Sequence, residues 1–400
     1  MTDALSLHPP ARRQPAIRQG NASAVLRAVL AHGSAARSEI AAATGLSAVS
    51  VGRQVTDLIG AGVLRELSPV GAELGRPRVP LEIDLHGHRV AGIHIGLHRS
   101  SLGVTDLRGN LLRRIELTHD STEPRPILEQ AAQAVETLPE RPIGLGIAVG
   151  GWVQPIDGTV VENDALGWRN VEVGTLLRER TGVPVWVESN VRAMALAESW
   201  LGGGSQAASL AYLFVGNVIG AGIVIRRALH RGPQGAAGAI AHVPLSDRGV
   251  TCQCGREGCF QALASDAAVL ARADELGLDG TRDLAGLIAI ARGGNTQAQG
   301  LLRRRARHVG EGVALLIDLL NPELVVLAGS GALDAPEYLK DLRQEASAKA
   351  HTDFEAERLI VPSSFGADAI VVGPCGLVLD AVYQRPTELI HPRPARRLSA

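Results

Sequence analysis

The sequence has no long apolar run. None approaches the roughly 18 consecutive residues that a membrane-spanning helix requires, and the first residues lack the basic-then-apolar order of a secretion signal. Lysine is almost missing, because Lys340 and Lys349 are the only two among 40 basic residues. The lack of a long apolar run and of a secretion signal argues against membrane and secreted proteins, and we therefore expect a cytoplasmic protein. The scarcity of lysine has no bearing on this.

Cysteine is scarce as well. There are four, and three crowd together as Cys252, Cys254 and Cys259, which in a reducing compartment indicates metal binding before disulfides. With His242 they form a His-x9-Cys-x-Cys-x4-Cys pattern, a closed tetrahedral set that favours zinc. A closed set leaves no position for an activated water, so we predict a structural zinc. The alternative is a group of reduced thiols, and we expect Cys375 to be a buried apolar residue.

The composition suits a folded protein of more than one domain. At 400 residues, 46% of them hydrophobic, the chain can supply two or three cores. The formal net charge is only -1, yet residues 1–80 hold nine arginines against five acidic residues. This asymmetry suggests an N-terminal module that faces a polyanion.

The N-terminal region has the pattern of a winged helix-turn-helix. After a Pro- and Arg-rich stretch, 1–17, which we expect to be disordered, residues 18–83 alternate apolar stripes with helix caps and glycines. The expected elements are helices Ala22–His32, Ser38–Thr44 and one from Ser47 to about Ala61, then strands Val63–Leu67 and Arg78–Ile83. The turn Gly75-Arg76-Pro77 would form the tip of the wing.

The third helix is expected to read DNA. Val51, Val55, Leu58 and Ile59 fall at helical spacing and should pack inward, which turns other residues toward a major groove. Arg76 at the wing tip could enter a narrow minor groove. The predicted DNA-contacting residues are Ser47, Ser50, Arg53, Gln54 and Arg76. A small helical interaction domain with an ordinary solvated face is the alternative.

From Val90 the pattern changes to apolar runs broken by glycine, and strands then alternate with helices as in an α/β domain. We expect one lobe over 84–190, completed by a C-terminal helix near 374–384, and a second lobe with the metal site over 191–373. Residues 385–400 should form a flexible tail. Two such lobes can close over a ligand.

Residues 18–383 resemble the ROK family, which groups repressors, open reading frames and sugar kinases. The resemblance rests on the winged helix, the segments Gly144–Val153, Val187–Glu198 and Val215–Val224, and the cysteine cluster, which matches the family's zinc motif. It implies a winged helix-turn-helix followed by a two-lobed, actin-like (ribonuclease-H-like) ATPase-type fold, a sugar in the cleft, and a homodimer or homotetramer.

The residues that would transfer phosphate differ from the family's kinases. His94 stands where an acidic residue would be, and Asn190 replaces the carboxylate base that would take the hydroxyl proton. Val218 replaces a glycine of the second phosphate loop, where phosphate needs access to the backbone. We therefore predict no catalytic residue and no kinase activity.

The sugar site has also changed. Ala239 and Gln261 replace two carboxylates, and Ala165 replaces an asparagine. The residues that could still bind an effector are Gly151, Asn163, Asp164, Asn190, His242 and Gln261. An unusual sugar or oligosaccharide, a non-sugar metabolite and no ligand at all remain open. Trp152 and Trp168 could stack on a sugar ring, although core positions are favoured.

These observations together predict a zinc-containing ROK-type transcriptional regulator, a repressor that binds double-stranded operator DNA as a homodimer or homotetramer. Ligand binding would favour one lobe arrangement and so lower the affinity for DNA. Activation is the other possible sign of regulation. The rival functions are a sugar kinase with an appended DNA-binding domain and a ligand-independent DNA-binding protein.

Overall fold

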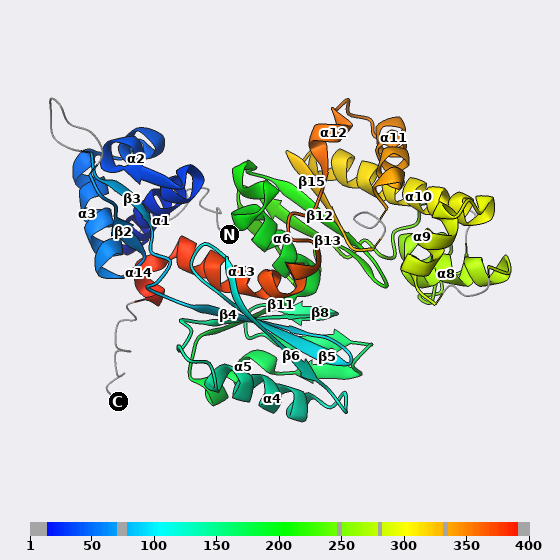
Figure 1. The fold of residues 1–400 in the computed structure, drawn as a ribbon, viewed down its shortest axis with the longest axis horizontal. Coiled ribbons are helices and arrows are strands. Elements are labelled where there is room, and N and C mark those ends of the chain that lie inside the picture. Colours follow the sequence, from blue (N-terminus) through cyan, green and yellow to red (C-terminus); the bar gives the residue numbers. More distant parts are fainter. Residues whose placement is uncertain (1–13, 70–77, 246–249, 279–281, 331–334, 391–400) are drawn as a thin grey trace, which may run out of the picture. The chain divides into compact units, whose positions relative to one another are not determined.

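The computed structural model describes residues 14–69, 78–245, 250–278, 282–330 and 335–390 (Figure 1). The chain divides into two compact units, and both are discontinuous in sequence. The first contains residues 1–90, 105–110 and 378–400, and the second contains 91–104 and 111–377. Within the described residues, every helix is too short or too polar to cross a membrane.

The first unit has the helices and wing that the sequence predicts. Three helices, α1 (Gln14–His32), α2 (Arg37–Thr44) and α3 (Ala48–Gly60), pack beside a small sheet. The sheet has the order β1-β3-β2, formed by Ser34–Ala36, Pro80–Ile83 and Leu64–Glu66. β2 and β3 are antiparallel and form the predicted wing, whose tip, including Gly75, Arg76 and Pro77, lies outside the described residues.

Local capping fixes the turn between α2 and α3. Gly45 ends α2 with a φ of 70°, a left-handed conformation that favours glycine. The amide of Ser50 donates to the hydroxyl of Ser47, which caps α3. α2 thus ends at Thr44 and α3 is capped by Ser47, which agrees with the predicted helix bounds.

Two segments near the chain ends, 14–17 and 386–389, are helical although the sequence predicted disorder or flexibility there. The helix α1 begins at Gln14 instead of Ala22, so residues 14–17 are not a disordered tail. Residues 385–400 were predicted to be flexible, but α14 (Pro386–Leu389) contacts α1 and α3, and Gln19 Nε2 donates to Thr387 Oγ1 at 2.9 Å. Packing against the first helices therefore orders a segment whose own composition favours disorder.

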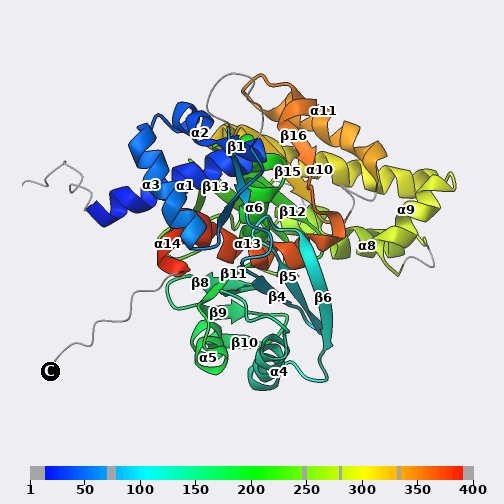
Figure 2. The same ribbon diagram turned by 60° about the vertical axis from the view of Figure 1, so that its left-hand side comes forward.

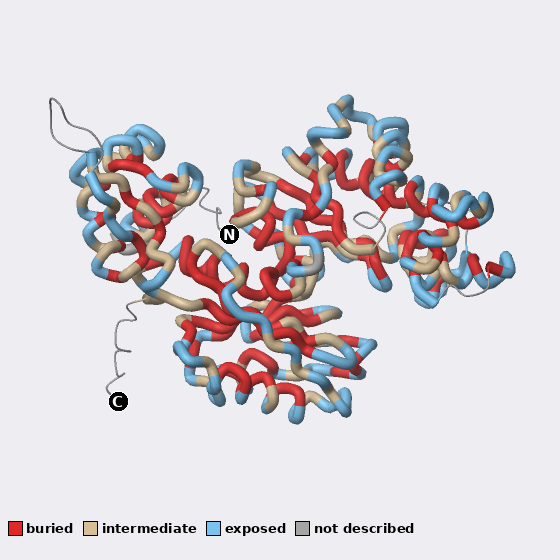
Figure 3. The backbone as a smooth tube through the Cα atoms, viewed as in Figure 1, coloured by how far each residue is buried: buried red, intermediate tan, exposed pale blue. Residues whose placement is uncertain are grey.

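The second unit contains two five-stranded sheets, both largely buried (Figure 3). The first has the order β11-β7-β4-β5-β6, and α4 and α5 cover one face. A small sheet, β10-β9-β8, belongs to the same core. The bounds are β4 (Val90–Ile95), β5 (Arg99–Thr105), β6 (Leu111–Thr118), α4 (Pro124–Glu136), β7 (Leu145–Val149), β8 (Trp152–Gln154), β9 (Thr159–Asn163), β10 (Trp168–Val171), α5 (Val173–Thr181) and β11 (Val185–Ser189).

The second sheet has the order β14-β13-β12-β15-β16, and α7, α10 and α11 cover one face. Helices α8 and α9 pack on the first half of α10 in a separate apolar cluster. The bounds are β12 (Leu210–Val215), β13 (Ile219–Ile225), β14 (Ala228–His230), α7 (Phe260–Ala264), α8 (Asp266–Glu275), α9 (Leu284–Arg292), α10 (Thr296–Leu320), β15 (Leu324–Ala328), α11 (Leu339–Lys349), α12 (Ala356–Leu359) and β16 (Ile360–Pro362).

Two helices, α6 (Asn190–Leu201) and α13 (Ala369–Gln384), lie between the two sheets (Figure 2). α6 contacts β12 and β13. α13 packs so closely on the first sheet that a Cβ at Gly146 would lie 1.8 Å from the carbonyl oxygen of Pro374. Cys375 is fully buried at this contact, as predicted. Asn190, the first residue of α6, lies between the two sheets and lines the cleft described below.

Candidate functional site

One face of α3 is accessible to DNA. The buried face contains one residue that was predicted to lie on the accessible face. Val51, Val55 and Leu58 are fully buried, as expected. Gln54 is also buried, so its predicted contact with DNA is wrong. The inward stripe runs through positions 51, 54, 55 and 58, and Ile59 lies at its edge.

The other predicted contacts lie on the accessible side of α3. Ser47 is exposed and Ser50 half-buried, with 3.0 Å between their hydroxyl oxygens. Arg53 is exposed and forms no hydrogen bond or ion pair with the residues that the structure describes. Arg76 belongs to the undescribed stretch 70–77. Arg53 is therefore the cation on this helix that DNA could bind without breaking an existing contact.

Other arginines of this module are already paired with carboxylates. Four ion pairs join neighbouring elements of the helix-turn-helix and wing, namely Arg18–Asp57, Arg37–Glu66, Arg65–Glu82 and Arg78–Glu39. All are largely solvated, so each stabilises the fold by little. A DNA phosphate would have to compete with a carboxylate for any of them, which increases the relative importance of Arg53.

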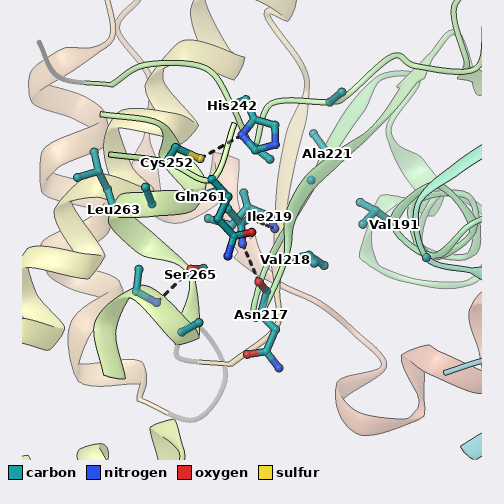
Figure 4. A pocket seen from close by; sticks show the side chains of 18 of the residues that line it. Val191, Asn217, Val218, Ile219, Ala221, His242, Cys252, Gln261, Leu263 and Ser265 are labelled. Atoms are coloured by element: carbon teal, nitrogen blue, oxygen red, sulfur yellow. Dashed lines mark hydrogen bonds between the residues drawn. The ribbon is translucent and has the colours of Figure 1, made fainter. Parts of the chain in front are cut away.

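A cleft of about 2200 Å³ opens in the second unit (Figure 4). Its walls include β4, β8 and the start of α6 on one side. On the other side they include the turn before β13, the loop after β14, α7, α8 and α10. All six predicted effector residues, Gly151, Asn163, Asp164, Asn190, His242 and Gln261, line this cleft. These six residues come from five separate segments of the chain and line one cavity.

Several of these side chains already have partners. Asn163 is buried, donates to the carbonyl of Gly150 and accepts from the amide of Leu166, both at 3.0 Å. Asp164 is exposed and pairs with Arg169 at 2.7 Å. A Cβ at Gly151 would lie 2.0 Å from the carbonyl oxygen of Glu162, so only glycine fits there. These residues mainly shape the cleft wall.

Asn190 is different, because its carbonyl oxygen is buried without a hydrogen-bond partner among the described residues. The side chain begins α6 and faces the cleft. A buried acceptor without a partner costs free energy unless a ligand or water donates to it. Among the six predicted residues, Asn190 is therefore the one whose side-chain acceptor lacks a donor, which a bound ligand could supply.

Gln261 holds the turn that precedes β13. Its Oε1 accepts from the amide of Ile219 at 2.8 Å, and its Nε2 donates to the carbonyl of Asn217 at 2.7 Å (Figure 4). Both ends of the amide are therefore occupied by the protein. Gln261 was predicted to contact an effector, but in this structure it fixes the loop that carries Val218.

A buried charge network beneath the cleft was missed by the sequence analysis. Glu188, with 1% of its side chain exposed, accepts from the Nε atoms of Arg192 and Arg231, each at 2.7 Å. Arg192 also donates to the carbonyl of Gly235. Glu188 lies in β11 and Arg192 in α6, so the pair spans a strand–helix junction and has no helical spacing that the sequence would reveal. The network joins β11 to the loop after β14.

His94 lines the cleft from β4. Burial lowers the pKa of His94 from 6.5 to about 4, because a charged imidazolium would lose its hydration, and Glu116 opposes this only in part. The side chain is therefore neutral near pH 7. It cannot supply the negative charge of the acidic residue that it replaces.

The lowered pKa of His94 makes stability depend on pH. Between about pH 6.5 and 4 the unfolded chain binds more protons than the folded one, so the free energy of unfolding falls as pH falls. We expect His94 to account for a loss of about 2 kcal/mol between pH 7 and pH 5. Urea unfolding at both pH values measures it. A His94→Gln variant should lose correspondingly less stability over that interval, and an unchanged difference would contradict the assignment.

The two tryptophans have different roles. Trp168 is buried and donates to the carbonyl of Thr122 at 2.6 Å, so it is a core residue, as favoured from the sequence. Trp152 is 39% exposed, lines the cleft and donates to the carbonyl of Gln234 at 2.6 Å. Of these two tryptophans, Trp152 is the one whose ring lies at the cleft.

His242, Cys252, Cys254 and Cys259 come together as the sequence pattern predicts. Their ligand atoms all lie within 4.8 Å of one another. The Sγ atoms of Cys254 and Cys259 are 3.6 Å apart, and Cys252 Sγ is 3.4 Å from His242 Nδ1. Neighbouring ligands of a tetrahedral ion with metal–sulfur bonds of about 2.3 Å lie roughly 3.5–3.8 Å apart. The cluster can therefore hold a metal ion.

The ROK family pattern matches residues 90–381, the region that forms the two sheets and the cleft. The chain belongs to the ROK family. A transcriptional regulator of Mycobacterium tuberculosis (strain ATCC 25618 / H37Rv) is 36% identical over 80% of this chain and 77% of its own length. The xylose repressor of Bacillus subtilis (strain 168) is 25% identical over 92% of this chain and 97% of its own length.

Solved structures of ROK proteins share the fold. A ROK family transcriptional regulator, described as a homologue of the Escherichia coli MLC protein, has a TM-score of 0.80 at 23% identity and covers 94% of this chain and 99% of its own. The ROK hexokinase from Thermus thermophilus has a TM-score of 0.65 at 29% identity, over 73% of this chain and 99% of its own. These structures confirm the predicted actin-like, two-lobed fold. The hexokinase matches a smaller share of this chain than the regulator does.

Proposed function

We propose that this ROK protein is a DNA-binding transcriptional regulator, a repressor whose affinity for its operator falls when a carbohydrate or a related metabolite occupies the cleft. The observation that carries the proposal is the presence, on one chain, of a winged helix-turn-helix with an accessible Arg53 and of a ROK cleft in which Asn190 stands at the position of the catalytic base. The names of the regulator relatives support it.

Three features of the cleft argue against phosphoryl transfer. Asn190, at the position of the base, has an amide that cannot accept the hydroxyl proton. Val218 is 61% exposed at the second phosphate loop, where its branched side chain obstructs access to the backbone. The amide of Ile219 in the same loop already donates to Gln261, so it cannot bind phosphate.

A sugar kinase with an appended DNA-binding domain is the second candidate, favoured by the likeness to the hexokinase. It requires ADP release that depends on both ATP and a sugar. We expect none above the rate without sugar. Sugar-dependent ADP release that Asn190→Ala abolishes would establish the kinase instead.

The effector is proposed to be a carbohydrate. Asn190 presents a buried acceptor without a partner, which a sugar hydroxyl could satisfy, and Trp152 provides an aromatic ring at the same cleft. The name of the Bacillus subtilis relative, a xylose repressor, supports this class of ligand. A non-sugar metabolite and the absence of any effector are the other outcomes of the binding test below.

Zinc is the proposed metal. Three thiolates and one imidazole are the ligands that zinc prefers in closed structural sites. The ligand segment, from His242 to Cys259, continues directly into α7 and Gln261, which holds the loop of Val218. When bound, the ion would cross-link a cleft wall that has few apolar residues of its own.

A two-fold symmetric assembly is proposed for DNA binding. Helix-turn-helix regulators bind pseudopalindromic operators because each protomer reads one half-site. We therefore propose a homodimer or a homotetramer, the two states that the ROK resemblance implies.

Fluorescence anisotropy on DNA from upstream of the protein's own gene, at physiological salt, tests the regulator. We expect tight binding over a non-specific duplex, and release by one member of a carbohydrate panel. Arg53→Ala should weaken binding by about tenfold to a hundredfold, since a bidentate contact from Arg to guanine is worth roughly 1–3 kcal/mol.

The matched control is Arg125→Ala, which removes an exposed arginine of α4 in the other compact unit. It should bind DNA as the wild type does. If Arg53→Ala and Arg125→Ala were indistinguishable on a duplex that the wild type binds specifically, the proposed DNA face would be wrong. Tight binding that no sugar disturbs would indicate a non-sugar effector or none.

A further inference from the structure

The first turn of α3 carries an apolar side chain that folding does not explain. Val49 is 84% exposed, and the buried side of the helix is already filled by Val51, Val55 and Leu58. A β-branched residue at an exposed helix position is a poorer helix former than alanine. Neither packing nor helix propensity accounts for a valine here.

The polar side chains near Val49 are bonded to each other or buried. Ser47 Oγ accepts from the amide of Ser50 and lies 3.0 Å from the hydroxyl of Ser50. Gln54 is buried. Val49 and Arg53 are four residues apart and therefore lie on one face of the helix. These two side chains are the free groups that the start of α3 can present to a base.

We propose that Val49 recognises thymine, by packing its two methyl groups against the C5-methyl group in the major groove, while Arg53 binds a neighbouring guanine. This inference rests on the proposed DNA-binding function. Thymine alone presents a methyl group in that groove, and apolar side chains are its usual partners. The contact removes apolar surface of both groups from water.

The helix geometry adds a constraint on the operator. Four residues of α-helix span about 6 Å, and successive base pairs are about 3.4 Å apart. The thymine read by Val49 and the guanine read by Arg53 should thus be one or two base steps apart. Ala48, exposed and small, permits the close approach that a methyl contact needs.

The alternative is that Val49 is an isolated surface valine, which is common in proteins. Removing the methyl group from the DNA distinguishes the two, because deoxyuridine differs from thymidine by that group alone. The operator is first recovered by selection from random duplexes with the full-length protein. Each thymine of a half-site is then replaced by deoxyuridine, and the Kd is measured for the wild type and for Val49→Ala.

We expect one thymine per half-site whose replacement raises the Kd of the wild type about three- to fivefold, the effect of one methyl group removed from an apolar contact. Val49→Ala should bind the thymine operator more weakly by a similar factor and should not distinguish the two bases. Leu319→Ala, which truncates another exposed apolar residue, 71% exposed and located on α10, should behave as the wild type.

The inference would be overturned if no deoxyuridine replacement affected the wild type, or if Val49→Ala kept the full sensitivity to it. Alanine is the better helix former, so loss of folding does not confuse the result, and circular dichroism checks this directly. Failure of the wild type to select any duplex would instead overturn the proposed DNA-binding function, and this inference with it. The two failures are therefore distinguishable.

Discussion

Cys259→Ser is expected to release the bound metal and to lower the melting temperature by roughly 5–10 °C. Cys259 is fully buried, and loss of a structural ion is among the few single changes that cost several kcal/mol. The serine hydroxyl is a poor ligand, so the ion would lose one of its four bonds. Gln261 is two residues away and holds the turn with Val218, so the effector response should weaken too.

Native mass spectrometry measures the metal directly. The wild type should carry one zinc ion per chain, and Cys259→Ser none. Cys375→Ala removes a different buried thiol, one that packs on the first sheet, and should keep the ion. Freshly purified wild type without zinc would contradict the proposed centre, whatever the melting temperatures were.

Glu188→Ala is expected to destabilise the second unit by about 3–5 kcal/mol. Removing one partner of a buried ion pair leaves the other charge uncompensated, and Arg192 has only 6% of its side chain exposed. Arg231 is partly exposed and can turn to solvent, so most of the cost comes from Arg192. Urea unfolding monitored by fluorescence measures the change.

Two comparisons test this explanation. Glu136→Ala breaks an exposed pair with Arg180 and should cost less than about 1 kcal/mol. A double variant, Glu188→Leu with Arg192→Met, removes both buried charges and should recover much of the stability lost in Glu188→Ala. A loss below about 1 kcal/mol for Glu188→Ala itself would show that the network is not a structural requirement.

The sequence predicted the elements whose signals are local. The bounds of α2 and α3 were predicted to within one residue, because glycine, serine and an apolar stripe mark where each helix lies. The short strands β8, β9 and β10 were missed, since three to five residues carry too little alternation. The C-terminal helix was expected near 374–384, yet α13 begins at Ala369 and keeps Pro374 inside.

The sequence predicted which residues line the cleft better than it predicted what each of them does there. All six predicted effector residues line the cleft, and they were named because they stand at or near positions of the ROK family's sugar-site motifs. The predictions that failed concerned side chains whose hydrogen-bond partners are distant in sequence. Gln261 bonds to a loop more than forty residues away, and Arg192 bonds to a carbonyl of Gly235. Gln54 failed for a different reason, because a small error in helical phase moves a residue from the surface to the core.

The contact of α14 with α1 and α3 has a consequence for synthesis. The unit that contains the helix-turn-helix is assembled from both ends of the chain, and Thr387 bonds to Gln19 within it. During translation α14 emerges from the ribosome only after both sheets have been made. A chain that is terminated or clipped before α14 would therefore lack part of the support of α3. In this way synthesis through α14 becomes a condition for a fully assembled helix-turn-helix unit.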